Sequence, residues 1–218
     1  VVLLMRPSLP RSWFDLCLVP EHDLSGGSVP ANVVVPRGVL NGIRPSPLRD
    51  KHRSLILVGG PSKHHGWDDR RTAEQILEVV GAEPSVQWTL STSRRTPASL
   101  LPTLQKARRR NLEVIAWDET RPGWLAEQLA NAGTVFVSED SVSMIYEALS
   151  SSADVGLLPL PRKRSSRVVR GIDRLIEDRL VIPLEQWRRH RFEHRNATVL
   201  QEADRCAAII RERLLDAA

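Results

Sequence analysis

Two adjacent glycines follow the apolar segment Ser54–Val58, and hydroxyl and basic side chains come directly after them. The run is Gly59-Gly60-Pro61-Ser62-Lys63-His64. Paired glycines at the end of a strand let backbone amides approach a phosphate closely, and the dipole of a following helix adds to the attraction. Lys63 would add a cation, and His64 or His65 a hydrogen-bond donor. The pattern favours a phosphate-bearing ligand; a tight turn with Asp68 as a helix N-cap is the alternative.

A second group of hydroxyl and guanidinium side chains lies between Ser93 and Pro97. Its arginines, Arg94 and Arg95, stand just before a proline that suits the first turn of a helix. Guanidinium groups at a helix start would hold a diphosphate through charge-assisted hydrogen bonds. The alternative is that Thr96 caps the helix and the arginines are simply solvated.

A third group combines serines with carboxylates after the apolar segment Thr134–Val137. It reads Ser138-Glu139-Asp140-Ser141-Val142-Ser143. Hydroxyl and amide donors near a helix N-terminus favour an anion there. Glu147 lies about one helical turn beyond Ser143. A carboxylate within an otherwise apolar helix can accept hydrogen bonds from paired ribose hydroxyls, although a capped helix with an exposed glutamate is the alternative.

Two further turns give weaker signals. The segment Trp117–Thr120 could present a loop beside a nucleobase, but helix capping is the simpler interpretation. The basic run Arg162–Arg164 stands beside two serines. Lys163 and Ser165 are therefore candidate ligand contacts, and a solvated basic loop explains the run equally well.

The sequence contains no pattern typical of a metal site or of a resident cofactor. His190 and His194 have the i, i+4 spacing of zinc-binding pairs, but Glu193 does not stand where a metalloprotease helix needs it. The surrounding arginines would also oppose a cation. The P-loop, the dinucleotide fingerprint and the strand-elbow serine motif are absent from the sequence.

Strands and helices alternate from about Arg53 onward, and this alternation is what positions the polar runs. Strands are expected at Ser54–Val58, Val86–Ser91, Glu113–Trp117, Thr134–Val137 and Asp154–Leu160. Amphipathic helical patterns lie between them, and they imply right-handed crossovers onto a parallel sheet. Ligands of such sheets bind at the carboxyl ends of the strands. We therefore predict a doubly wound, Rossmann-like α/β domain over residues 51–218, with a terminal helix at Thr198–Leu215.

Residues 1–50 show strands but no helical pattern. The apolar runs Val1–Met5, Phe14–Val19 and Asn32–Val35 each end in turn residues, and Asn41–Arg53 has the composition of a linker. Three strands without covering helices cannot bury both faces. This segment is therefore expected to be the truncated remnant of an N-terminal domain. Its exposed strand faces predict a homodimer or another covering partner.

The bulk composition limits the class of protein. No apolar run approaches the roughly 18 residues of a membrane helix. The two cysteines lie in apolar stretches, which favours reduced thiols and a cytoplasmic protein. The net charge of +5 fits an anionic small ligand or an acidic membrane surface, with peripheral binding at the inner membrane. Specific nucleic-acid recognition is not expected, because only 5% of the residues are aromatic and stacking platforms are scarce.

Together these motifs resemble the family named for plant elongated-mitochondria fission factors. The most specific matching segments are Gly59-Gly60-Pro61-Ser62-Lys63-His64, Thr92-Ser93-Arg94-Arg95-Thr96-Pro97 and Ser138-Glu139-Asp140-Ser141-Val142-Ser143-Met144. The resemblance covers nearly the whole chain. It implies a fold of the glycosyltransferase B type, in which two Rossmann-like domains face a cleft and the C-terminal one holds a nucleotide-sugar donor.

The resemblance also implies roles for individual residues. Glu147 falls where related transferases bind the donor ribose. The Gly59-Gly60 turn, Ser93, Arg94 and Ser141 to Ser143 would surround the diphosphate, while Lys163 and Ser165 would approach the sugar. From the other domain, His22 and Asp23 are candidates for a catalytic base or acceptor contacts. The implied reaction is a metal-independent hexosyl transfer; a non-enzymatic interaction protein that keeps the fold is the alternative, so enzymatic activity stays open.

Overall fold

The computed structural model of the chain describes residues 1–24, 28–193 and 198–216. The chain forms two compact units. The smaller unit contains residues 1–42 together with residues 200–218, and the larger unit contains residues 43–199. The candidate ligand-binding turns all belong to the larger unit.

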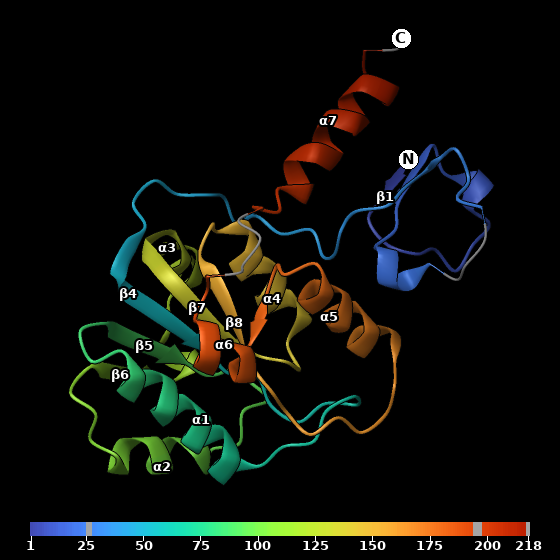
Figure 1. The fold of residues 1–218 in the computed structure, drawn as a ribbon. Helices are drawn as coiled ribbons and strands as arrows, with labels where there is room; N and C mark the ends of the chain where they lie inside the picture. Colours follow the sequence, from blue (N-terminus) through green and yellow to red (C-terminus); the bar gives the residue numbers. More distant parts are fainter. Residues whose placement is uncertain (25–27, 194–197, 217–218) are drawn as a thin grey trace. The chain divides into compact units, whose positions relative to one another are not determined.

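The larger unit is built on a six-stranded parallel sheet (Figure 1). Its strands are β4 (Asp50–Leu57), β5 (Gln87–Ser91), β6 (Leu112–Ile115), β7 (Ala132–Ser138), β8 (Asp154–Leu158) and β9 (Ile182–Pro183). The strand order is β6-β5-β4-β7-β8-β9. This confirms the predicted parallel α/β domain and its five expected strands. The sixth, β9, was not expected, because two residues ending in a proline give almost no strand pattern.

Six helices connect the strands or follow the last one. They are α1 (Asp69–Ala82), α2 (Leu100–Lys106), α3 (Trp124–Asn131), α4 (Val142–Ser150), α5 (Arg167–Glu177) and α6 (Leu184–His190). Two of them begin at side-chain caps, since Asp68 accepts from the amide of Arg71 at 3.0 Å and Ser166 accepts from the amide of Val169 at 3.2 Å. The start of α4 has no such side-chain bond.

One layer of the core of the larger unit lies between the sheet and the helices α1, α2 and α6. Buried side chains of these helices pack on alternate residues of the strands, which include Ile56, Leu90 and Phe136. Phe136 contacts Trp187 edge-on, with ring centroids 5.2 Å apart. Because the strands lie directly beneath helices, their apolar runs are nearly continuous, as buried parallel strands require.

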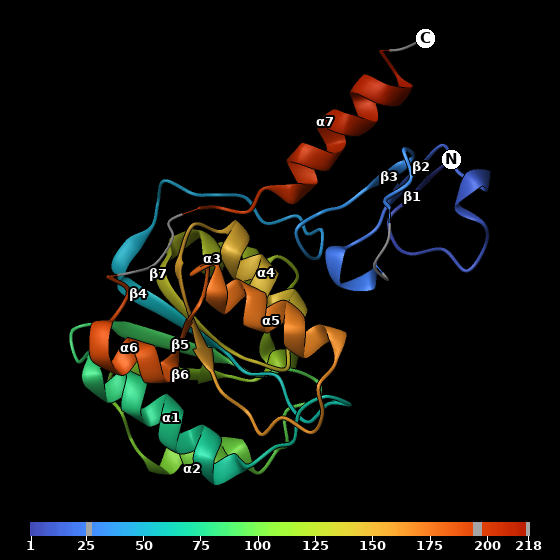
Figure 2. The same cartoon turned by 45° about the vertical axis from the view of Figure 1, so that its right-hand side comes forward.

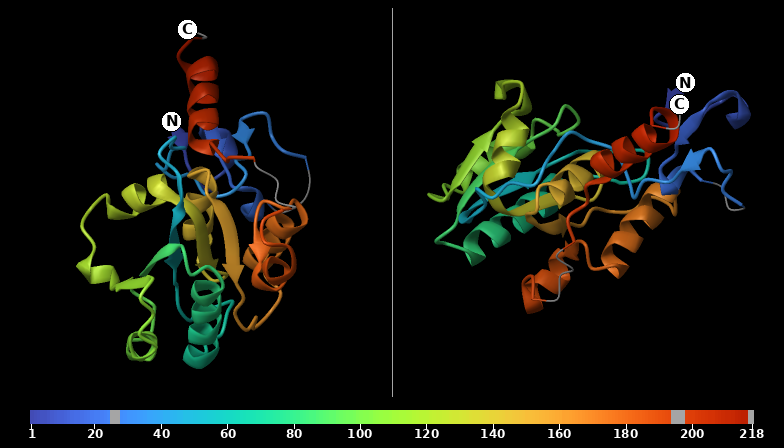
Figure 3. Two further views of the ribbon diagram at one scale, coloured as in Figure 1. Left: turned by 60° about the vertical axis from the view of Figure 1, so that its left-hand side comes forward. Right: turned by 90° about the horizontal axis from the view of Figure 1, so that it is seen from above.

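The order in which the strands join the sheet reverses at β4, between β4 and β7. The strands β5 and β6 follow β4 on one side, and β7 then starts on the other side. Leu57 pairs with both Ser91 and Val137, so β4, β5 and β7 end at the same level. Figure 3 shows β4, β7 and β8 running alongside one another. Such a switch point opens a crevice at the carboxyl ends of the strands, where open α/β sheets bind ligands.

The smaller unit contains a three-stranded parallel sheet and the terminal helix. Its strands, in sheet order, are β1 (Val2–Leu3), β2 (Leu16–Leu18) and β3 (Val33–Val34). Helix α7 (Glu202–Leu214) places Cys206 against Leu16, Leu18 and Val34. From the sequence, this helix was predicted to belong to the second domain, and the strands were predicted to have no helical cover. In the structure α7 covers one strand face, because Cys206 and its apolar neighbours on the helix contact those strands.

Exposed apolar side chains are still present in the smaller unit. Among the described residues of this unit, the most exposed are Val1, Trp13, Leu215, Met5 and Leu4. The predicted homodimer or covering partner therefore stays a prediction. Among the residues that the structure describes, no helix combines the length and apolar composition that crossing a membrane would require.

Candidate functional site

The turns after β4 and β7 meet at the switch point through a buried hydrogen-bond network. The amide of Gly59 donates to Ser138 Oγ at 2.7 Å, and the amide of Gly60 donates to Asp140 Oδ2 at 2.9 Å. Ser138 Oγ in turn donates to Asp140 Oδ1 at 2.7 Å. The structure thus brings four of the predicted site residues together. Their donors are engaged with one another, and the carboxylate of Asp140 occupies the place at the glycine turn where a phosphate was predicted.

Both glycines are required by this close packing. A Cβ atom on Gly59 would overlap the carboxylate of Asp140, and one on Gly60 would overlap the backbone of Arg95. Each overlap involves either backbone or a buried carboxylate, so the neighbour has no room to move. The glycine pair is therefore explained by the approach of Asp140 and Arg95, whether or not a phosphate binds beside it.

Arg95 neutralises the buried carboxylate of Asp140. Its Nη2 atom lies 2.7 Å from Asp140 Oδ2, and its Nη1 atom donates to the carbonyl of Gly60 at 3.1 Å. The Asp140 side chain is fully buried, whereas the side chain of Arg95 is 43% exposed. Breaking a buried pair of this kind leaves an uncompensated charge, which is strongly destabilising. The outer side of the guanidinium still faces solvent.

The turn after β5 is fixed by Thr96. Its hydroxyl donates to the carbonyl of Val58 at 3.0 Å and accepts from the amide of Ser93 at 2.8 Å. Helix α2 begins only at Leu100, so Thr96 is not the helix cap that the sequence alternative assumed. These bonds tie the β5 turn to the glycine turn and leave the Arg94 side chain exposed.

Trp117 adds an aromatic surface beside Arg94. The guanidinium carbon of Arg94 lies 5.3 Å from the Trp117 ring centroid, and the indole is 42% exposed. The amide of Trp117 donates to Thr92 Oγ1 at 3.0 Å, which joins the ends of β5 and β6. The loop does cap itself, as expected, because Glu119 Oε2 accepts from the amide of Ala116 at 3.0 Å. Capping explains the Glu119 contact but not the exposed ring of Trp117.

The first turn of α4 has no side-chain cap. Ser141 is the N-cap residue, but its side chain makes no capping bond. The first amides of a helix have no partner within the helix, so this terminus carries a partial positive charge. Ser143 is exposed on the same turn.

Glu147 lies one turn further along α4 and is half-buried. Within the described part of the chain its carboxylate makes no hydrogen bond or ion pair. Burial raises the pKa of Glu147 above its ordinary value. A half-buried carboxylate without a partner is costly for the protein alone, and it would gain from hydroxyl donors of a ligand.

The remaining predicted residues lie on the loops after β4 and β8. Lys163 Nζ donates to the carbonyl of Ser62 at 2.9 Å. Ser62 Oγ accepts from the amide of His64 at 3.2 Å, while Lys63 is exposed. Ser165 Oγ lies 3.5 Å from an Arg170 nitrogen, the limit of a hydrogen bond. These loops therefore contact each other, and their cations lie at the same sheet edge as the glycine turn.

His65, which the sequence offered beside His64 as a donor to a ligand, instead forms a buried polar pair with Glu139 that was not predicted. His65 is fully buried, and its Nε2 atom lies 4.0 Å from Glu139 Oε2. The other carboxylate oxygen of Glu139 lies 3.4 Å from Arg162 Nη2. Neither imidazole nitrogen of His65 has a hydrogen-bond partner in the described structure. An unmet buried polar group of this kind costs about 1–3 kcal/mol.

Stability should fall as the pH drops through the histidine range. Burial lowers the pKa of His65; Glu139 and Asp140 oppose this shift, and Arg162 and His64 add to it. The unfolded chain then takes up a proton below about pH 6.5 that the folded chain does not bind, so acid favours unfolding. Urea unfolding between pH 5 and 8 should show this slope, and His65→Gln should flatten it. The exposed His52, changed to Gln, is the control; equal slopes in all three proteins would contradict the prediction.

The two candidates from the N-terminal segment belong to the smaller unit. His22 and Asp23 lie in the short 3-10 helix η2 (Glu21–Asp23). The carbonyl of Asp23 accepts from Arg6 at 3.3 Å, and the side chain of His22 falls outside the described part of the structure. Their predicted approach to a ligand stays a prediction.

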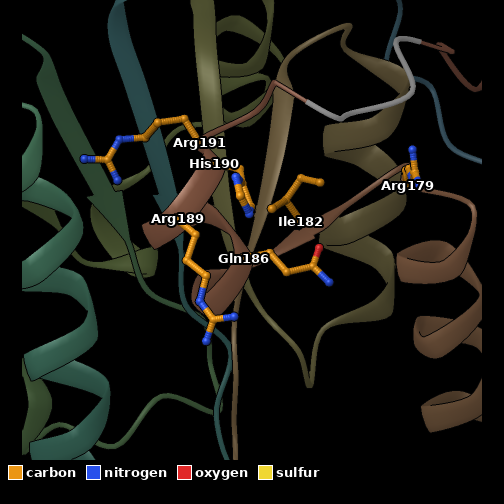
Figure 4. A pocket seen from close by; sticks show the side chains of 6 residues that line it. All are labelled: Arg179, Ile182, Gln186, Arg189, His190 and Arg191. Carbon is orange, nitrogen blue, oxygen red and sulfur yellow. The ribbon is translucent and has the colours of Figure 1, made fainter.

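A hollow of about 440 Å³ lies away from the switch point, between Arg179 and the end of α6 (Figure 4). Arg179 precedes β9, so the hollow lies at the amino end of that strand. Two of its arginines have carboxylate partners, since Arg189 pairs with Glu185 and Arg191 pairs with Glu83. These cations also suit the C-terminus of α6. The hollow therefore gives less support for a ligand site than the carboxyl edge does.

The histidine pair considered as a zinc site is only partly described. His190 ends α6, and His194 lies outside the described residues. Across residues 1–24, 28–193 and 198–216, no three histidine, cysteine, aspartate or glutamate side chains come together as metal ligands.

A family model described as "Mitochondrial fission ELM1" matches residues 1–214. The chain belongs to the mitochondrial fission ELM1 family. The match covers both units of this ELM1-family chain and confirms the resemblance that the three polar runs indicated. A search of curated proteins finds no match to the chain.

Solved structures share only the fold with this ELM1-family chain. The glycotransferase of kitacinnamycin is 20% identical, with a TM-score of 0.47, and the match covers 91% of this chain but 50% of that one. The C-terminal domain of a group 1 glycosyl transferase (LpcC) from Francisella tularensis is 12% identical, with a TM-score of 0.37, over 69% of this chain and 92% of that one. The cypemycin decarboxylase CypD is 10% identical, with a TM-score of 0.42, and the match covers 65% of this chain and 85% of that one.

Proposed function

We propose that the larger unit binds a nucleoside-diphosphate ligand, with a nucleotide sugar as the donor of a metal-independent hexosyl transfer. The site is the carboxyl edge of the sheet at the switch point between β4 and β7. Parallel α/β sheets bind ligands at such points, and helix N-termini there attract phosphates. Family membership is consistent with this proposal but names no activity.

The observation that carries the proposal is the arrangement on α4. The uncapped first turn of α4 carries Ser143, and one turn beyond Ser143 comes Glu147, whose carboxylate has no partner among the described residues. Four residues of helix span about 6 Å along the axis, which is close to the separation of a phosphate from its ribose. The helix start suits the phosphate, and the carboxylate suits the ribose hydroxyls. A helix without a ligand would gain nothing from burying that carboxylate.

The other accessible side chains extend this arrangement. In the proposal Arg94, the outer side of Arg95 and Ser143 hold the diphosphate, while Lys163 and Ser165 approach the sugar. The exposed Trp117 ring offers a flat apolar surface to the base. Cations and the helix dipole would neutralise the leaving diphosphate during transfer. In the assembled protein His22 and Asp23 would supply the base or the acceptor contacts.

A non-enzymatic interaction protein is the second candidate function. One observation favours it: the amides of Gly59 and Gly60 are already satisfied by Ser138 and Asp140. The turn is therefore complete without a phosphate, as it would be in a relative that kept the fold and lost the reaction.

A thermal-shift panel tests the ligand. A nucleoside diphosphate should stabilise the intact protein more than the matching nucleoside, because only the diphosphate reaches the helix start and the arginines. At a concentration 100 times its Kd, a ligand adds about 2.7 kcal/mol to stability. Inorganic pyrophosphate separates the phosphate contribution from that of the nucleoside. Equal shifts for nucleoside and nucleoside diphosphate, or no shift with either, would contradict the proposal.

A further inference from the structure

Two loops at the carboxyl edge of the sheet pair with each other like short antiparallel strands. The β4 loop is residues 59–68, and the β8 loop is residues 159–166. Their bridge partners are His65 and Arg162. Two backbone bonds flank this bridge, from Gly66 N to Pro161 O at 2.7 Å and from Lys163 N to His64 O at 2.9 Å. Figures 1 and 2 show the two loops running together beyond the strand ends.

The paired loops lie over the carboxyl end of β7. Strand β7 lies between β4 and β8, so loops that leave these two strands and meet must cross beyond its end. His65 from one loop and Arg162 from the other both approach Glu139, the first residue after β7. The whole run from Ser138 to Ser141 is at most 8% exposed. With the loops paired, this run therefore offers almost no surface to a ligand arriving from solvent.

The side-chain contacts of the paired loops with Glu139 are long. Glu139 lies 3.4 Å from Arg162 and 4.0 Å from His65, both longer than a good hydrogen bond. Five buried side-chain polar atoms have no partner in the described residues, and three of them belong to His64 and His65. Within the part of the chain that the structure describes, the ammonium of Lys163 donates to the carbonyl of Ser62 alone, at 2.9 Å. The closed arrangement thus leaves polar groups unmet that an open arrangement would hydrate.

We propose that the β4 and β8 loops form a lid that must part before a diphosphate reaches Ser141, the buried N-cap residue of α4. This inference rests on the proposed function, since it concerns access to the same site. Glu139 is the latch, because it is the one buried carboxylate that both loops approach. Parting the loops releases Lys163 from the Ser62 carbonyl and the Nη2 atom of Arg162 from Glu139, while the Nη1 atom of Arg162 keeps its pair with Asp173 at 2.8 Å. The Lys163 ammonium and the freed side of Arg162 then meet the ligand phosphates.

A reversible disulfide tests the lid in the full-length chain. The bonds on either side of His65 and Arg162 make them a non-hydrogen-bonded antiparallel pair, whose Cα atoms lie about 4.5 Å apart and suit a disulfide. In His65→Cys/Arg162→Cys the reduced protein should bind the nucleoside diphosphate. Oxidation should weaken that binding at least tenfold, and dithiothreitol should restore it. The wild type, treated in the same way, controls for Cys17 and Cys206, which are buried.

The outcomes separate the lid from the ligand. Binding to the wild type, with equal affinities for the oxidised and reduced variant, would overturn the lid. A wild type that binds no nucleoside diphosphate would overturn the proposed function and the gating with it.

Hydrogen exchange on the wild type tests opening even if the variant does not fold. The amides of Gly66 and Lys163 should exchange at least tenfold faster than that of Phe136 in β7, and equal protection would overturn the lid.

Discussion

Replacing Asp140 by asparagine should lower the free energy of unfolding by about 2–4 kcal/mol. The carboxylate accepts from the amide of Gly60, the hydroxyl of Ser138 and the guanidinium of Arg95. An asparagine amide keeps the shape but turns one acceptor into a donor. That donor would face another donor in a fully buried position, and Arg95 would lose its counter-charge.

Urea unfolding of Asp140→Asn, measured in parallel with the control variant Asp173→Asn, tests this prediction. Asp173 also pairs with an arginine, Arg162 at 2.8 Å, but its side chain is 40% exposed. Exposed pairs contribute about 0–1 kcal/mol, so the control should lose much less stability than the Asp140 variant. Similar losses in the two variants would show that the Asp140 network adds nothing beyond a surface ion pair.

The sheet could be predicted from the sequence because its central strands are buried on both faces. Burial of this kind leaves runs such as Ser54–Val58 and Thr134–Val137, bounded by turn residues, and the structure places strands at both. Helix α6 and strand β9 carried no comparable signal. The strand has two residues, and the helix that follows has seven, too short for a clear apolar period.

The smaller unit could not be assembled from local patterns. Helix α7 is separated from the strands it covers by more than 150 residues, as in the bond from Arg205 to the carbonyl of Val35 at 2.9 Å. Adjacency in sequence favoured grouping the helix with the second domain. Only the contacts of Cys206 with Leu16 and Leu18 show where its apolar face lies.

The candidate site was predictable as a set of residues but not as a network. Turn chemistry identified Gly59, Gly60, Ser138 and Asp140, and topology brings them together. A sequence does not reveal whether a free amide will meet a ligand or the protein's own carboxylate. That distinction depends on the register between β4 and β7, which pairs Leu57 with Val137.

The His65–Glu139 pair was missed for a related reason. The two residues are 74 positions apart, and their third neighbour, Arg162, comes from yet another loop. Each of the three residues alone has an ordinary surface interpretation. A histidine next to glycine and a tryptophan gives no sign of full burial, so only the paired loops could have identified it.

Replacing Glu147 by glutamine should weaken ribonucleotide binding by about tenfold or more, since about 1.4 kcal/mol corresponds to a factor of ten. The carboxylate can accept two hydroxyl hydrogen bonds, and charge-assisted bonds are worth about 1.5–3 kcal/mol each. Glutamine keeps the length and the helix propensity but offers one neutral acceptor. Calorimetric titration with a nucleoside diphosphate and its 2′-deoxy analogue should show a much smaller loss for the deoxy compound.

The same substitution should not cost the protein stability. Because burial raises the pKa of Glu147, its contribution to stability is present at low pH and is lost as the pH rises through the folded-state pKa. Glutamine removes that loss. The variant should therefore melt at or above the wild-type melting temperature at pH 7, and its gain in melting temperature over the wild type should be smallest at pH 4. Glu177→Gln, at an exposed position ending α5, is the matched control and should change neither binding nor melting. Wild-type affinity of Glu147→Gln for both nucleotides would mean that no ribose is bound there, and a lower melting temperature would mean that the carboxylate serves the fold instead.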